Sequence, residues 1–212
     1  MNTEIKVAEV KSASDIIVVL DKSQSMGVMG QEPIQALNDY IKKQQEVDPT
    51  SLFSLYTFNQ ETTREYFNIP LGEMKEYTDY TPNGLTACYD CIFQAIKDKM
   101  ETDRNRNVVM LVITDGMDNS SKRFSQRQTS LKIKDQESTY NWQVVFLASN
   151  LDVYGVGNSM GMDRCKTSAF AQDCKGDFTS KMASISACTS IYRESSKTTE
   201  PRKLDITVTK PQ

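Results

Sequence analysis

The sequence contains no histidine and no stretch of about eighteen consecutive apolar residues. Without histidine there is no imidazole to act as a general base or to complete a zinc site with cysteine. The missing apolar stretch argues against a membrane-spanning helix. The 25 basic and 28 acidic residues nearly balance. Nucleic-acid binding calls for a clustered basic excess, so no nucleic-acid partner is expected.

Disulfides and a secretion signal are also not expected. The five cysteines are an odd number, which suits free thiols in a reducing compartment. Residues 1–9 lack the apolar core of a signal peptide, so a cytoplasmic location is predicted. Cys88 and Cys91 have the C-x-x-C spacing of zinc and redox sites. Because they share an apolar helical stripe and no second close pair exists, we interpret them as core thiols.

Strand and helix patterns alternate along the chain and predict an α/β fold with a mostly parallel sheet. Strands are expected at 16–21, 51–58, 65–69, 108–115 and 142–148. Helices are expected from about residue 31, and at 85–101, 125–138, 152–160 and 177–193. Polar tails flank this core. The alternating run 204–209 in the second tail is predicted either to add an edge strand or to pair with a partner.

Three short polar stretches follow or flank these elements. Asp21-Lys-Ser23-Gln-Ser25 follows the first apolar strand, Gly84-Leu-Thr86 precedes a helix, and Thr114-Asp115-Gly116 follows a second apolar strand. Ligands bind outside the carboxyl ends of strands in open α/β sheets. The three stretches are therefore predicted to meet at one edge of the sheet.

Their side chains form an all-oxygen set of two carboxylates and three hydroxyls. Such a set suits a hard divalent cation, Mg²⁺ or Mn²⁺. Neutral hydroxyls would leave the ion electrophilic towards a carboxylate from a partner. The alternative is that Asp21 and Ser23 only cap the helix that follows, which would leave Thr86 and Asp115 unexplained.

In this pattern the sequence resembles the von Willebrand factor A domain with a metal-ion-dependent adhesion site. The family pattern is Asp-x-Ser-x-Ser, then a threonine, then an aspartate after a later strand. The resemblance covers roughly residues 14–196, leaving 1–13 as an extension and 197–212 as a tail. It implies a Rossmann-like fold, with helices on both faces of the sheet and 65–69 as one antiparallel edge strand. The implied metal ligands are Asp21, Ser23, Ser25, Thr86 and Asp115.

In the family the serines and usually the threonine touch the ion directly, and the aspartates often act through water. The segments 81–90, 113–119 and 146–150 look most like short stand-alone A-domain proteins of bacteria, phages and related viruses. The resemblance implies a non-enzymatic module that grips an Asp or Glu of a protein partner. The residues expected to surround the ion and to touch the partner are Met26, Asn83, Gly116, Asp118 and Asn119.

Two alternatives remain open. One is a structural or assembly component, such as a virion or phage-related protein, in which the ion mainly stabilises the fold. The other is a Mg²⁺-dependent phosphotransfer enzyme of the haloacid dehalogenase type. That class needs a second aspartate where this chain has Ser23, and no glycine-rich phosphate loop is present. The sequence leaves the partner and the oligomeric state open.

Overall fold

Two fully buried strands form the centre of the sheet in the computed structural model, which describes residues 14–102, 107–149, 164–196 and 204–207. Strand β1 (Asp15–Asp21) pairs in parallel with β4 (Val108–Thr114). Both are nearly continuous runs of large aliphatic residues, which is typical of strands covered on both faces. Alternate residues of β1 serve the two faces: Ile16 and Val18 pack into one core cluster and Ile17 and Val19 into the other.

The sheet has six strands in the order β3-β2-β1-β4-β5-β6. Strand β3 pairs antiparallel with β2, and all other pairs are parallel. The remaining strands are β2 (Leu52–Phe58), β3 (Thr62–Pro70), β5 (Gln143–Ala148) and β6 (Thr167–Ala169). This confirms the predicted α/β class with one antiparallel edge strand.

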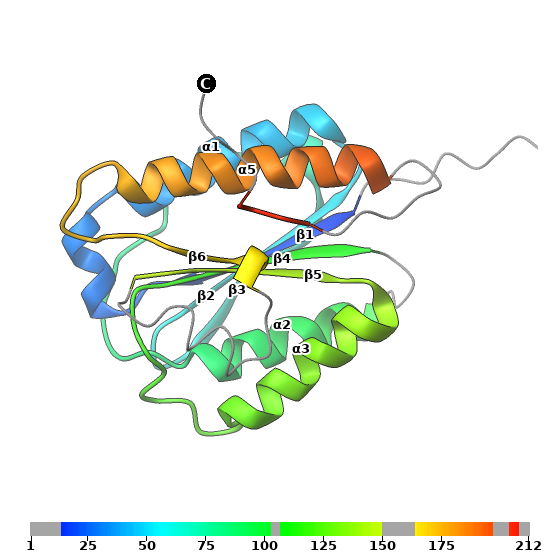
Figure 1. Cartoon of the computed structure of the whole chain (residues 1–212). Coiled ribbons are helices and arrows are strands. Elements are labelled where there is room, and N and C mark those ends of the chain that lie inside the picture. The colour runs from blue at the N-terminus through cyan, green and yellow to red at the C-terminus, as the bar shows by residue number, and fades with distance from the viewer. Residues whose placement is uncertain (1–13, 103–106, 150–163, 197–203, 208–212) are drawn as a thin grey trace, which may run out of the picture.

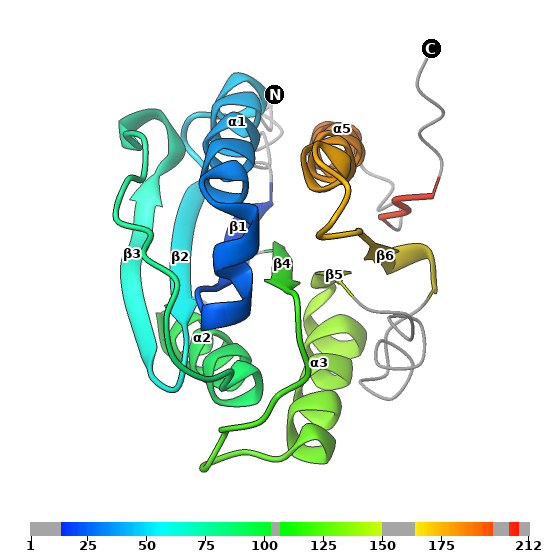
Figure 2. The ribbon, with the colours of Figure 1, turned by 90° about the vertical axis from the view of Figure 1, so that its left-hand side faces the viewer.

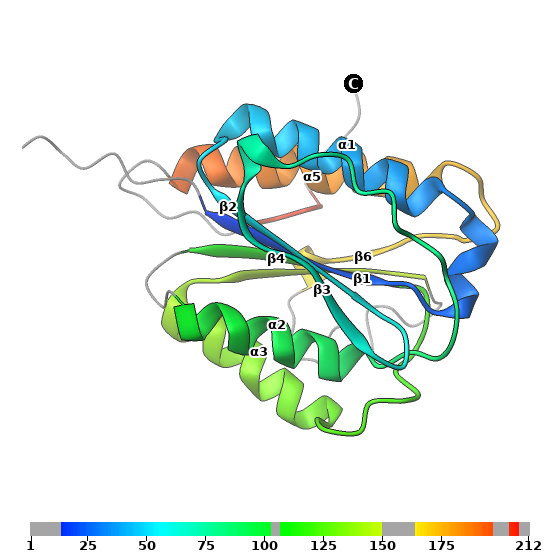
Figure 3. The ribbon, with the colours of Figure 1, turned by 180° about the vertical axis from the view of Figure 1, so that it is seen from behind.

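Helices cover both faces of the sheet. Helices α1 (Glu32–Val47) and α5 (Asp177–Ser196) lie on one face, and α2 (Cys88–Thr102) and α3 (Gln126–Tyr140) lie on the other (Figures 1 and 3). Short 3-10 turns occur at η1 (Gln24–Met29), η2 (Leu71–Glu73) and η3 (Arg164–Lys166). Within the described ranges no helix is long and apolar enough to cross a bilayer.

Buried polar contacts fix α5 against α1 and β1. Arg193 is fully buried, and its guanidinium donates to the carbonyl of Ser14 at 3.0 Å and to that of Gln44 at 2.9 Å. Gln44 in turn donates to the carbonyl of Ser186 at 3.0 Å. Satisfied buried donors of this kind define one helix position, because any shift would leave them without partners.

Several element boundaries differ from the predicted ones. Helix α2 begins at Cys88 and not at Leu85, and β3 spans Thr62–Pro70 where only 65–69 was expected. Strand β6 was not predicted, because three residues carry too little pattern to recognise. The helix expected at 152–160 lies outside the described residues. In the second tail, Leu204 and Ile206 are buried, but residues 204–207 form no strand.

Candidate metal centre

Asp21 lies at the end of β1, at the edge of the sheet that faces the viewer in Figure 2. Its side chain is fully buried. Oδ1 accepts a hydrogen bond from the backbone N–H of Ser23 at 2.7 Å, and Oδ2 accepts one from the Thr114 hydroxyl at 2.6 Å. Because Thr114 ends the neighbouring strand β4, these two bonds fix the carboxylate between the two central strands.

A chain of hydroxyls connects this carboxylate region to Asp115. The Oγ atoms of Ser23 and Ser25 lie 3.2 Å apart, and the Ser25 hydroxyl donates to Asp115 Oδ1 at 2.8 Å. Ser23 is the N-cap residue of η1, yet its side chain makes no capping bond. The capping alternative therefore does not account for the Ser23 hydroxyl, which faces the second serine.

Thr86 is brought to the same edge by its backbone. Its N–H donates to the side-chain oxygen of Asn119 at 2.9 Å, and its carbonyl accepts from the backbone N–H groups of Asn119 and Ser120 at 2.9 and 3.1 Å. On the other side, the Gly84 carbonyl accepts from the Gln24 N–H at 3.1 Å. The loop that carries Thr86, whose side chain is buried, thus lies between η1 and the loop that follows Asp115.

Gly84 is required for this loop path. Its φ of +76° lies in the region that favours glycine. A Cβ at this position would come within 1.8 Å of Gln60 Oε1, which accepts a hydrogen bond from the Leu85 N–H. The glycine therefore permits both the turn and the contact that precedes Thr86.

Burial dominates the electrostatics of the two carboxylates. The pKa of Asp21 is raised from 3.8 to about 6, mainly because desolvation outweighs the hydrogen bonds that lower it, with a smaller contribution from the nearby charge of Asp115. Desolvation also raises the pKa of Asp115. No lysine or arginine in the described part of the chain forms an ion pair with either group. Two buried acids without a cation are costly, and a divalent ion would offset that cost.

The donor set therefore fits a hard cation. Among the described residues no group of three or more His, Cys, Asp or Glu side chains gathers as a metal site. The candidate set relies on two carboxylates and on hydroxyls, which are ligands that Mg²⁺ accepts together with several waters. The structure brings Asp21, Ser23, Ser25 and Asp115 into one hydrogen-bonded group and places Thr86 on the adjoining loop.

Three supporting residues were not assigned a role from the sequence. The amide of Gln172 donates to the second oxygen of Asp115. The Thr114 hydroxyl orients Asp21. The Asp90 carboxylate accepts from the backbone N–H groups of Lys122, Arg123 and Phe124 at 2.8–3.0 Å and so fixes the loop after Asp115. Gln172 is 57 positions from Asp115 in the sequence, and no local sequence pattern predicts such a contact.

The five residues expected around the ion have different environments. Met26 is fully buried in the core because η1 turns its side chain inward. It is therefore not available to touch a partner, contrary to the expectation from the sequence. Asp118 is half-buried and accepts from the Tyr89 N–H at 2.9 Å, which caps the first turn of α2. Asn83 and Asn119 are exposed, and Gly116 is half-buried.

The cysteines form no site. None of the five forms a disulfide, and Cys88 and Cys91 are buried in the core between α2 and the sheet. Burial raises the pKa of both thiols. This agrees with their interpretation as core residues.

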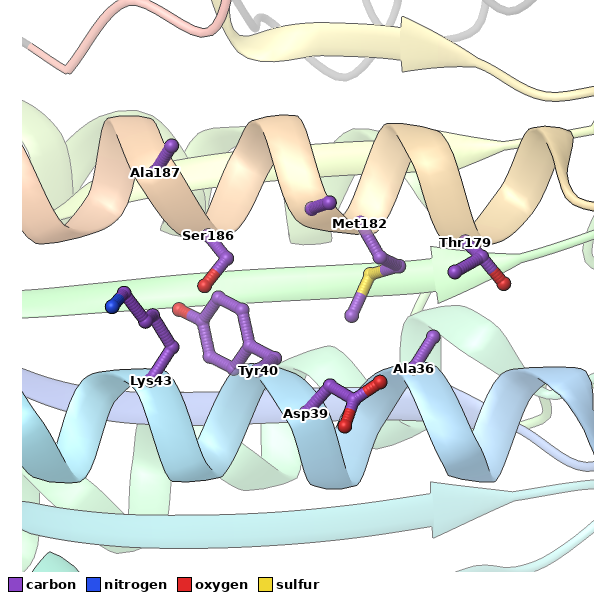
Figure 4. Close-up of a pocket in the computed structure, with 9 residues that line it drawn as sticks. Ala36, Asp39, Tyr40, Lys43, Thr179, Met182, Ser186 and Ala187 are labelled. Atoms are coloured by element: carbon purple, nitrogen blue, oxygen red, sulfur yellow. The ribbon is translucent and has the colours of Figure 1, made fainter.

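A cavity of about 240 Å³ lies away from the metal centre, between α1 and α5 (Figure 4). Tyr40 of α1 points towards Ser186 of α5, and Met182 of α5 points towards α1. None of the five candidate ligands lines this cavity. Its position and mostly apolar wall give no reason to connect it with the metal centre.

Neither the comparison with protein-family models nor that with curated proteins gives a match. Solved structures do match. The von Willebrand factor domain of the type V pili tip protein Mfa5 from Porphyromonas gingivalis is 10% identical with a TM-score of 0.66, covering 86% of this chain and 97% of that one.

Two further solved structures agree. A von Willebrand factor type A protein from Catenulispora acidiphila is 12% identical with a TM-score of 0.57, covering 84% of this chain but only 43% of its own. The manganese-loaded TRAP protein of Plasmodium vivax is 15% identical with a TM-score of 0.56, covering 76% of this chain and 70% of that one. At such identities the likeness shows the fold alone, which is the fold that von Willebrand factor A domains have.

Proposed function

We propose that this chain is a protein-binding module that holds Mg²⁺ or Mn²⁺ at Asp21, Ser23, Ser25, Thr86 and Asp115. The ion grips an Asp or Glu carboxylate of a protein partner. The observation that carries the proposal is the hydrogen-bonded group at the carboxyl edge of the sheet, in which the Ser23 N–H donates to Asp21 and the hydroxyls of Ser23 and Ser25 lead to Asp115. Ser25 is also exposed, which leaves this group reachable from solvent.

The chemistry of the group supports binding over catalysis. The bound ion supplies a Lewis-acidic position for a carboxylate oxygen. Ser23 stands where a phosphotransfer enzyme of the haloacid dehalogenase type needs a second carboxylate, and the chain has no histidine to act as a base. We therefore propose a non-enzymatic role. The five cysteines, none of them in a disulfide, support a cytoplasmic location.

Thr86→Val tests the gripping mechanism because it keeps the side-chain shape and removes one hydroxyl. We expect a folded domain with weaker Mn²⁺ affinity in isothermal titration. We also expect it to lose the capture of acidic peptides that wild type selects from a random peptide library in Mn²⁺. Those peptides should dissociate in EDTA, and replacing their Asp or Glu with the amide should abolish binding.

Thr129→Val is the matched control. Thr129 is fully buried in α3, and its hydroxyl has no hydrogen-bond partner among the described residues. Its replacement should leave metal affinity and peptide capture unchanged. Normal capture by Thr86→Val, or by wild type in EDTA, would contradict the mechanism. Tight metal binding without any metal-dependent capture would favour the alternative in which the ion only stabilises the fold.

A further inference from the structure

Exposed large apolar side chains are concentrated around the candidate metal centre. Three of them are Val28 in η1, Leu85 before Thr86 and Met117 after Asp115, with exposed fractions of 76%, 54% and 65%. The other two in the described part of the chain, Leu131 and Ile191, lie on helices α3 and α5. One such residue therefore occurs on each of the three loops that carry the candidate ligands.

The three loops lie against one another at one edge of the sheet. The Gln24 N–H donates to the Gly84 carbonyl at 3.1 Å, and the Asn119 N–H donates to the Thr86 carbonyl at 2.9 Å. Figure 2 shows this edge facing the viewer, with the turns of η1 and the segments that lead into α2 and α3. Val28, Leu85 and Met117 are called the apolar rim below.

Charge is scarce on the same surface. The segments 23–31, 81–86 and 116–121 together contain one charged side chain, Asp118, although 25% of the whole sequence is charged. The carboxylate of Asp118 accepts from the Tyr89 N–H and from the Ser121 hydroxyl at 2.6 Å, so it is occupied in capping α2. These segments therefore offer a partner mainly apolar and neutral contacts.

We infer that the apolar rim selects a protein segment whose metal-binding Asp or Glu is flanked by apolar side chains. This rests on the proposed function, in which the ion takes the carboxylate. Apolar contacts around a central polar contact exclude water from it. A metal–carboxylate interaction is stronger where water is excluded, because the local dielectric is lower. The apolar rim thus selects the partner segment and also excludes water from the metal–carboxylate interaction.

The test selects a random 12-residue peptide library on immobilised protein in Mn²⁺ with release by EDTA. The rim variant carries Val28→Ser, Leu85→Ser and Met117→Ser. The matched control carries Leu131→Ser and Ile191→Ser, which remove the exposed apolar residues outside the rim. Mn²⁺ titration of wild type, the rim variant and the control variant should give the same metal affinity.

We expect peptides released from wild type to carry Leu, Ile, Val, Met or Phe within two positions of an Asp or Glu. Their affinity, measured by fluorescence anisotropy, should fall about tenfold or more in the rim variant and stay unchanged in the control. Replacing the apolar flanks of a peptide with serine should weaken its binding to wild type, with little further loss in the rim variant.

Metal-dependent acidic peptides without apolar flanks, or equal binding by the rim variant, would overturn this inference and leave the proposed function standing. A complete lack of EDTA-released peptides would overturn both. Mn²⁺-dependent flotation with phosphatidylserine vesicles, in preference to peptides, would also overturn the inference, because the rim would then serve a lipid surface.

Discussion

Asp21→Asn should stabilise the protein in chelator while abolishing its response to metal. The substitution keeps the side-chain shape. The amide oxygen can still accept from the Ser23 N–H, and the Thr114 hydroxyl can turn to donate to the Gly116 carbonyl, which lies 3.2 Å away. What disappears is a buried negative charge and its repulsion with Asp115.

The magnitude follows from the pKa of Asp21. Burial raises this pKa from 3.8 to about 6, so above pH 6 the folded state contains an ionised group that it disfavours. At about 1.4 kcal/mol per pKa unit, the cost is about 3 kcal/mol at pH 7.5. For a domain of this size, that corresponds to a melting temperature roughly 6–12 °C higher for Asp21→Asn in EDTA.

The direction of the pKa shift determines how this stability advantage changes with pH. A carboxyl group whose pKa is raised by folding binds more protons in the folded state, so the free energy of unfolding of wild type falls as pH rises from about 4 to 6. The advantage of Asp21→Asn should therefore shrink to below about 1 kcal/mol at pH 4. Asp205→Asn is the control, because hydrogen bonds from Thr207 lower the pKa of that exposed carboxyl and no advantage should appear.

Metal should remove most of this advantage. A hundredfold excess of Mg²⁺ over its Kd should stabilise wild type by about 2.7 kcal/mol and leave Asp21→Asn unchanged. The assay is chemical denaturation at pH 4 and pH 7.5, in EDTA and in Mg²⁺. A less stable Asp21→Asn in EDTA at pH 7.5, or an advantage that persists at pH 4, would refute the argument from burial. An equal Mg²⁺ response in both proteins would place the ion elsewhere.

Two further predictions concern packing. Cys88 and Cys91 should react with a thiol reagent only as the protein unfolds, whereas the exposed Cys174 should react at once; rapid native labelling of both buried thiols would reopen a redox or zinc role. Gly84→Ala should cost about 1–3 kcal/mol of stability in denaturant and weaken metal binding, because φ is positive and the Cβ meets Gln60. Gly116→Ala is its control, since a Cβ there meets nothing within 4 Å; an equal cost would contradict the role of Gly84.

The central strands could be predicted from the sequence almost residue by residue. β1 and β4 are buried on both faces, and a strand in that position has a continuous apolar sequence that can be recognised directly. The start of α2 could not be predicted in this way. The Leu85 N–H is taken by the Gln60 side chain and the Thr86 N–H by that of Asn119. These partners are distant in sequence, so the local periodicity does not predict the contacts.

The candidate ligands could be proposed from the sequence because the three stretches that carry them follow or precede recognisable elements. Their supporting residues could not, since Gln172 and Asp90 act through contacts that depend on the whole fold. Met26, by contrast, was predicted to touch a partner and is not available to do so. It adjoins Ser25 in the sequence, but η1 turns it into the core, while Val28 two residues later is exposed. Neighbourhood in sequence does not determine which side chains of a turn face a partner.

The arrangement of charge connects stability with function in this domain. Asp15 at the other end of β1 is as buried as Asp21, but it pairs with the ammonium group of Lys99 at 2.8 Å. Asp21 has hydroxyl and amide donors and no basic partner among the described residues. A permanent lysine beside Asp21 would stabilise the apo fold and would also occupy the position of a cation. The same strand thus carries one acid that is neutralised within the chain and a second acid that the ion of the proposed function would neutralise. The second acid lies at the edge where the three loops expose their apolar residues.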